Sequence, residues 1–153
     1  MPRFKFALDP LLDLRRREED LCKREVGRLE QIRQALQDRL TDRQRDIAEG
    51  KELLRSSLIG SLDAGFLRQQ AASIISVDQL ARRTVIEFAG VAQHLSAAQA
   101  VLIEAAKRRR AIEILRERRL EEWKREEGRK ETAFLDDLAN SALARTRMEG
   151  LDA

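Results

Sequence analysis

The chain has 153 residues, of which 37% are charged and only 4% aromatic, and its 30 basic residues barely outnumber its 27 acidic ones. Ala, Leu, Glu, Arg, Lys and Gln dominate, which is typical of long helices and coiled coils. A hydrophobic content of 42% is too high for a disordered chain. The two charge signs alternate as on a solvated helix face, and nucleic-acid signatures such as interleaved aromatics are missing. We therefore expect a helical protein with no nucleic-acid partner.

The number of cysteines and the N-terminal sequence indicate the cellular compartment to expect. Cys22 is the only cysteine, which excludes an internal disulfide and fits a reducing environment, with a buried thiol at core-like spacing. Residues 1–10 lack the long apolar run of a secretory signal. We found no stretch approaching the roughly 18 apolar residues of a membrane span. The expectation is a cytoplasmic chain without an integral membrane segment.

The first long helix is expected over residues 10–57. Asp9 is a suitable cap and Pro10 suits the first helical position. Apolar residues recur at Leu11, Leu14, Leu21, Leu29, Ile32, Leu36, Leu40, Ile47 and Leu54. The steps of three and four from Leu29 to Leu36 are the heptad signature, and the seam continues at sevens from Leu40. The two successive steps of four that end at Leu40 indicate a local stutter.

A turn region is expected over residues 58–76. Asp63 is placed to cap a short helix over residues 66–72, and the β-branched run from Ser73 to Ser76 is poor in helix formers. Ser76 and Gln79 fit a capping box. These signals predict that the second long helix begins at about residue 77; it is expected to run to about 149, with Gly150 as its C-cap.

The second helix shows a clear seam followed by a charge-dense stretch. Its apolar positions are Phe88, Val91, Leu95, Ala98, Leu102, Ala105 and Ile112. From Lys107 to Glu131 charged residues dominate, and a short apolar set returns at residues 133–139. The fold class predicted is all-α: an antiparallel two-helix coiled-coil hairpin, forming a single domain over residues 1–153.

A hairpin turning near residue 66 would place Leu40 opposite Ala92 and leave residues 124–148 as an overhanging C-terminal helix. That helix carries an apolar stripe, which is typical of a docking or self-association surface. The alternative is a frayed tail.

Signs of chemistry are absent from the sequence. His94 is the only histidine and has no cysteine or histidine near it, and the paired glutamates from Glu121 onward are matched by neighbouring arginines. No phosphate-binding Gly-rich motif occurs, and a two-helix hairpin offers no water-excluding pocket. We expect no catalytic residue, no cofactor and no metal site.

Both ends of the chain resemble one family. The opening residues 4–15, FKFALDPLLDLR, resemble the N-terminal signature of FliJ, a coiled-coil protein of the flagellar export apparatus. Residues 115–123, LRERRLEEW, and residues 135–139, LDDLA, support the resemblance, which covers essentially the whole chain.

The resemblance implies a component of bacterial flagellar type III protein export, similar to the central shaft of rotary ATPases. The implied partners are the hexameric flagellar export ATPase, the export-gate membrane protein and, in addition, export chaperones. The implied location is cytoplasmic, peripherally associated with the inner-membrane export apparatus. A relative in a virulence secretion system and a purely structural coiled-coil scaffold or spacer stay open as alternatives.

Two contact surfaces follow as hypotheses. An export-gate contact is expected near the turn, at Ile74, Val77 and Leu80; the alternative is that these residues pack against Leu54, Leu58 and Phe66 to close the turn. An ATPase contact is expected at the opposite end, where a cationic lattice meets an apolar anchor, at Arg116, Arg118, Arg119, Arg125, Arg129, Phe134, Leu135 and Leu138. The alternative is that these charges only keep a long helix in solution.

Overall fold

The computed structural model describes residues 3–149, with side chains up to Leu143. It is 91% helical, and no strand occurs among the described residues. Two helices make up the chain, α1 over Asp9–Ser56 and α2 over Ala64–Glu149. Gly150, the expected C-cap, lies outside the described residues. Contacts divide the described residues into a first unit of residues 3–16 with 107–149 and a second unit of residues 17–106.

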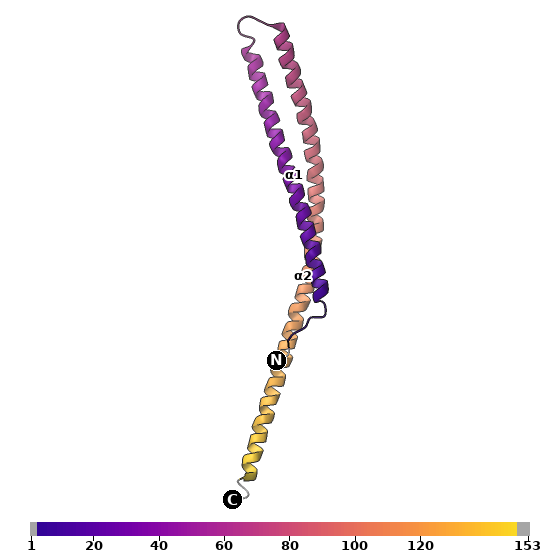
Figure 1. Cartoon of the computed structure of the whole chain (residues 1–153), viewed down its shortest axis with the longest axis vertical. Coiled ribbons are helices and arrows are strands. Elements are labelled where there is room, and N and C mark those ends of the chain that lie inside the picture. Colours follow the sequence, from indigo (N-terminus) through magenta and orange to yellow (C-terminus); the bar gives the residue numbers. More distant parts are fainter. Residues whose placement is uncertain (1–2, 150–153) are drawn as a thin grey trace. The chain divides into compact units, whose positions relative to one another are not determined.

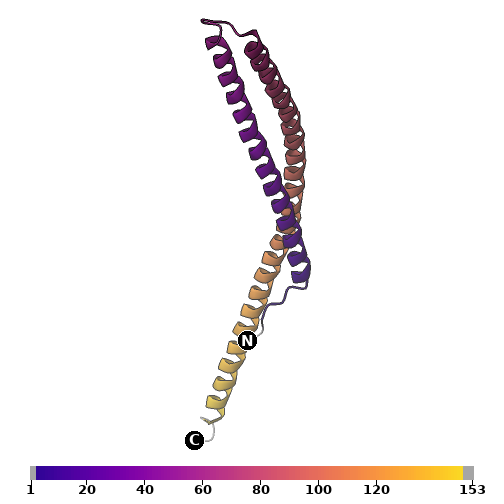
Figure 2. The ribbon, with the colours of Figure 1, turned by 45° about the horizontal axis from the view of Figure 1, so that its top comes forward.

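In the second unit, the two helices lie side by side and antiparallel, joined by a loop over residues 57–63 (Figures 1 and 2). Local hydrogen bonds end α1: the hydroxyls of Ser56 and Ser57 donate to the Leu53 carbonyl at 2.9 and 2.7 Å. Gly60 then adopts a φ of 102°, which residues with a Cβ rarely tolerate. This left-handed residue helps the chain to reverse.

The start of α2 corrects the sequence prediction. Asp63 is a cap, as expected, because its Oδ1 accepts hydrogen bonds from the Gly65 and Phe66 amides at 2.8 and 3.2 Å. The helix that it caps, however, is α2 itself, which begins at Ala64 and continues without interruption. The separate short helix, the break before residue 77 and the capping box at Ser76 are therefore wrong.

Packing explains why the β-branched run stays helical. Counting back from Phe88 by sevens gives Ala81, Ile74 and Leu67, and each is buried or half-buried. The seam of α2 therefore starts near the loop. Burial of this stripe against α1 outweighs the weak helix propensity of the residues between its members.

The register of the hairpin also differs from the one expected. A Cβ built on Gly50 lies 3.0 Å from Cγ1 of Ile74, so these two positions face each other. Stepping outward by heptads places Leu36 opposite Phe88 and Arg43 opposite Ala81. Leu40 then faces Thr84 and not Ala92, because the loop is centred near Gly60 and not near residue 66.

No stutter interrupts α1. Its buried and half-buried positions continue in alternating steps of four and three through Leu29, Arg33, Leu36, Leu40, Arg43 and Ile47. Polar residues hid this phase, because Arg33 is half-buried where the stutter was expected and Arg43 occupies a core position. Its Nε is buried and has no hydrogen-bond partner among the described atoms. Small Ala81, only 8% exposed, leaves room for this side chain.

In the first unit, the N-terminal segment packs along α2. Phe6 is 8% exposed and Leu12 only 2%. The rings of Phe4 and Trp123 lie 6.0 Å apart at 54°, a favourable tilted aromatic pair. The segment from Arg3 to Leu8 thus forms a strap that packs along α2.

The helix start in this unit is shifted by one residue. The Leu8 carbonyl accepts the Leu12 amide at 2.9 Å, so Leu8 occupies the cap position expected for Asp9. The Asp9 carboxylate instead pairs with Arg116 at 3.2 Å. A long-range ion pair has replaced the local cap.

One expectation about membranes needs correction. Within the residues searched, α2 contains an 18-residue window that is apolar enough, by length and composition alone, to cross a membrane, and only 6% of that window is buried. A single helix of this kind is weak evidence for a span. Its exposed apolar face nevertheless calls for an explanation.

Candidate partner-binding surfaces

The structure splits the residues expected to contact an export gate. Ile74 and Val77 are half-buried seam residues, and Ile74 sits against Gly50. Leu80 is 39% exposed and its neighbour Ile75 58%. Only the latter two are available to a partner, so the expected group does not form one surface.

The loop tip carries apolar side chains that the sequence analysis did not single out. Ile59 is 83% exposed and Leu62 is 65% exposed. Leu53, Leu58 and Phe66 are also exposed beside the loop. The signal was visible in the sequence, since isoleucine and leucine alternate with glycine and serine in a segment too short to bury them. Large apolar groups concentrated on a loop are typical of a contact surface.

A groove of about 540 Å³ runs between the helices further along the second unit. Leu36 and Val91 form its floor, and Arg39, Glu87 and His94 stand at its edge. Mixed apolar and charged lining suits a protein segment better than a small molecule.

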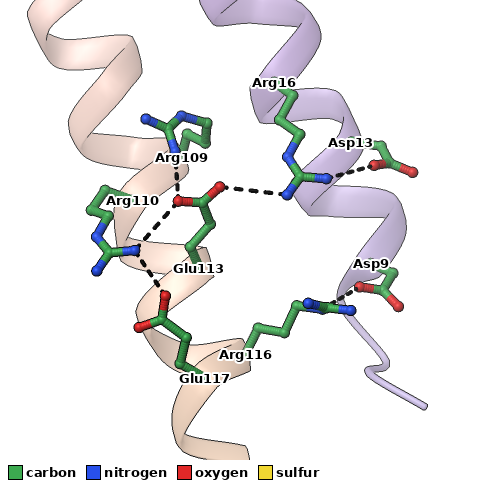
Figure 3. A network of polar contacts seen from close by, with 8 residues as sticks. All are labelled: Asp9, Asp13, Arg16, Arg109, Arg110, Glu113, Arg116 and Glu117. Carbon is green, nitrogen blue, oxygen red and sulfur yellow. Dashed lines mark hydrogen bonds and ion pairs between the residues drawn. The ribbon is translucent and has the colours of Figure 1, made fainter. Parts of the chain in front are cut away.

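At the other candidate surface, ion pairs join the N-terminal segment to α2 (Figure 3). Arg16 and Arg110 each reach the Glu113 carboxylate at 3.5 Å, and Arg109 from the preceding turn binds it as well. Arg110 also pairs with Glu117 at 2.9 Å. The Arg16–Glu113 and Asp9–Arg116 pairs hold the start of α1 against α2, whereas the pairs of Arg109 and Arg110 lie within α2 and position the Glu113 carboxylate.

Hydrogen bonding governs the titration of this network. The bond from Arg109 is the largest cause that lowers the pKa of Glu113, and the bonds from Arg16 and Arg110 act in the same direction. The pKa of Arg110 is raised, first by its hydrogen bond to Glu117. The charged forms of Glu113 and Arg110 are therefore favoured.

The arginines expected to bind an ATPase fall into two groups. Arg116, Arg119 and Arg125 are engaged, with Asp9 at 3.2 Å, Glu122 at 3.3 Å and Glu121 at 3.9 Å. Arg118 and Arg129 are exposed and have no partner among the described residues. Residues 107–130 carry eleven Lys and Arg against six Glu, which leaves an excess of five positive charges. This segment attracts acidic surfaces.

The apolar anchor expected beside these arginines is fully accessible. Phe134 is 63% exposed, Leu135 62% and Leu138 52%. Spacings of three and four place them on one stripe of α2. Every residue from Gly128 to Leu143 is exposed, so nothing in the described structure covers this stripe.

Among the residues searched, no group of three or more His, Cys, Asp or Glu is arranged to hold a metal ion. The strap and α2 enclose a cavity of about 380 Å³, lined by Phe4, Phe6, Leu115, Arg119 and Trp123 among others. Its titratable groups are Lys5, Arg119, Glu122 and Glu126.

Comparison with known proteins identifies the family of the chain. No curated protein and no solved structure matches it. The family model described as flagellar FliJ protein matches residues 4–148, which is nearly the whole chain and includes both terminal signatures. This chain therefore belongs to the FliJ family of flagellar proteins.

Proposed function

We propose that the chain is a non-enzymatic coiled-coil component of flagellar type III export that couples or regulates the export ATPase and the export gate. Membership of the family implies the export apparatus. The observation that carries the finer proposal is the end of α2, where unpartnered cations stand beside an uncovered apolar stripe.

The ATPase contact is proposed at this end. Arg118 and Arg129 can bind acidic side chains without breaking an existing pair, and Phe134, Leu135 and Leu138 supply an apolar anchor. Contacts of this type form fast and weaken with salt. Such properties suit repeated engagement with equivalent subunits of a ring. The C-terminal helix is proposed to project as a docking element.

The gate contact is proposed at the loop end. Ile59 and Leu62 join Leu80 among the accessible apolar residues there, whereas Ile74 and Val77 serve mainly to close the hairpin. Export chaperones remain proposed partners without an assigned surface. We propose a cytoplasmic protein that associates peripherally with the export apparatus at the inner membrane.

A charge-reversal experiment tests the ATPase contact. Arg118→Glu/Arg129→Glu should lower stimulation of the export ATPase about tenfold, because two attractive contacts become repulsive. The matched control is Arg17→Glu/Arg24→Glu, which reverses two exposed and unpartnered arginines in α1. Equal stimulation by both variants and the unmodified chain would contradict the assignment.

A second pair of variants tests the gate contact. Leu80→Ser should reduce binding to the cytoplasmic part of the gate while leaving the unfolding temperature unchanged. Val77→Ser should lower the unfolding temperature, since Val77 is a seam residue. If only Val77→Ser impaired export, and in proportion to lost helicity, the region would serve only to close the turn. If neither partner bound the chain, the scaffold alternative would hold.

A further inference from the structure

A second, unoccupied heptad stripe runs along α2 on the side opposite to the seam. Its members alternate in steps of three and four, and all are exposed: Ile86, Ala89, Gln93, Ser96, Ala100 and Ile103. Ile86 is 72% exposed and Ile103 56%. Such regular spacing is the pattern by which a helix packs against another helix.

The surroundings of this stripe are almost free of charge. Between Val85 and Ala106, only Glu87 and Glu104 are charged, in a chain with 37% charged residues. Val85 and Val101 add exposed apolar surface beside the stripe. A solvated helix face of this length would ordinarily carry alternating charges.

The order of residues identifies the occupant. Read in either direction, the stripe runs isoleucine, alanine, polar residue, polar residue, alanine, isoleucine. An antiparallel copy of the same helix therefore matches it layer by layer: Ile86 faces Ile103 of the second copy, Ala89 faces Ala100, and Gln93 faces Ser96. A self-complementary patch of this kind is the requirement for a two-fold symmetric dimer.

Flanking positions agree with this pairing. In the same register, Arg83 lies beside Glu104 of the second copy, which also has a contact within its own chain, and symmetry brings these opposite charges together twice. Arg83 is exposed and has no partner among the described residues. On the same flank, Gly90 lies beside Ala97 of the second copy. A Cβ built on Gly90 meets no atom within 4 Å, so the hairpin itself does not require the glycine, whereas a close helix approach benefits from it.

We propose that the outer face of α2 between Arg83 and Ala106 is a self-association surface on which a second copy of this chain packs antiparallel. The contact is about 35 Å long at 1.5 Å per residue. Its central residues are small, so the buried area lies near the lower limit of specific interfaces, about 1,200 Å². We therefore expect a dimer that dissociates in the micromolar range.

Sedimentation equilibrium of the full chain measures its association. The proposal is tested with variants that carry charged residues at the centre of the stripe. Gln93→Lys/Ser96→Lys gathers four positive charges there and should weaken association at least tenfold. Gln93→Lys/Ser96→Glu sets each lysine against a glutamate of the other copy and should restore it. Gln31→Lys/Gln34→Lys, at exposed positions of α1, is the matched control and should leave association unchanged.

Orientation is tested by cross-linking in a Cys22→Ser background. Ala89→Cys/Ala100→Cys should form an intermolecular disulfide, because the two positions face each other across the antiparallel pair. Ala89→Cys alone should not, since only a parallel pair brings Ala89 of both copies together. Efficient cross-linking of the single variant would overturn the antiparallel register.

Two results would overturn self-association itself. One is a monomeric mass at every concentration of the unmodified chain. The other is failure of the Lys/Glu variant to associate when the Lys/Lys variant is also monomeric. Co-sedimentation of a monomeric chain with phosphatidylcholine–phosphatidylglycerol vesicles would assign this face to a lipid surface instead.

Discussion

The two units hold their helices together by different means. In the second unit, a heptad seam of mostly apolar side chains runs from the loop along both helices. In the first unit, aromatic side chains of the strap and ion pairs such as Asp9–Arg116 join the N-terminal segment to α2. Apolar burial resists salt and pH, whereas surface ion pairs are screened. The first unit is thus the one whose cohesion responds to solution conditions.

The largest effect should come from the seam of the second unit. Leu36 is 5% exposed and faces Phe88 in the register above. Leu36→Ala should lower the free energy of unfolding by about 2–4 kcal/mol, since it removes buried methyl groups and leaves a cavity. Leu21, 63% exposed, is the control, and Leu21→Ala should cost less than about 0.5 kcal/mol. Urea unfolding followed by circular dichroism at 222 nm measures both.

An effect of similar size, but confined to the strap, is expected in the first unit. Phe6 is 8% exposed, and Phe6→Ala should detach the strap at a local cost of about 3 kcal/mol. Trp123 is the only tryptophan and contacts Phe4, so its emission should shift to the red. Far-UV helicity should change little, because the strap precedes α1. Phe134→Ala, at an exposed position, should leave the emission unchanged; a shift there would show that Trp123 reports on more than the strap.

Alanine substitutions at two glycines distinguish the effect of close helix packing from that of helix propensity. At Gly50, a Cβ would lie 3.0 Å from Ile74, so Gly50→Ala forces the seam apart and should destabilise the second unit by about 1 kcal/mol. At Gly27, a Cβ meets no atom within 4 Å, and Gly27→Ala should stabilise α1 by roughly 0.5–1 kcal/mol. The urea midpoint should therefore fall for Gly50→Ala and rise for Gly27→Ala. Equal gains would mean that Ile74 moves aside without cost.

Hydrophobic spacing predicted the fold class and the seam residues from Phe88 to Ile112, because apolar residues at heptad positions are visible wherever polar ones do not intervene. Hydrophobic spacing failed to predict the seam where polar residues occupy heptad positions. Ala81 and Thr84 obscured the continuation of the α2 seam toward Leu67, and local propensity then dominated the reasoning over residues 73–76. Arg43 similarly obscured the phase of α1. The burial of a polar residue depends on what stands opposite, and the sequence of one helix does not contain that information.

The candidate surfaces were predictable only in part. Charge density and an apolar stripe identified the end of α2, but which arginines are engaged depends on side chains that the fold brings near, as Asp9 does for Arg116. Leu80 and Ile74 seemed equivalent in sequence, and the register separates them. The exposed apolar residues of the loop were overlooked because the turn was placed about six residues too late.

The smallest effect concerns the ion pairs of the first unit. Glu113→Gln should lower the stability of the contact between the start of α1 and α2 by about 0.5–1 kcal/mol at pH 7 and low salt. Because hydrogen bonding, first from Arg109, lowers the pKa of Glu113 in the folded chain, its contribution is present above its ordinary pKa of 4.5 and is lost as the pH falls below that value. Urea unfolding followed by Trp123 emission measures the free energy of unfolding of the unmodified chain and of Glu113→Gln. The difference between these two values should shrink on acidification and in high salt. Glu25→Gln, which breaks a pair with Arg28 inside α1, is the control and should not alter the Trp123 signal. A Glu113→Gln effect that persisted at pH 3 would mean that the carboxylate charge does not hold this end together, and that aromatic packing of the strap does so alone.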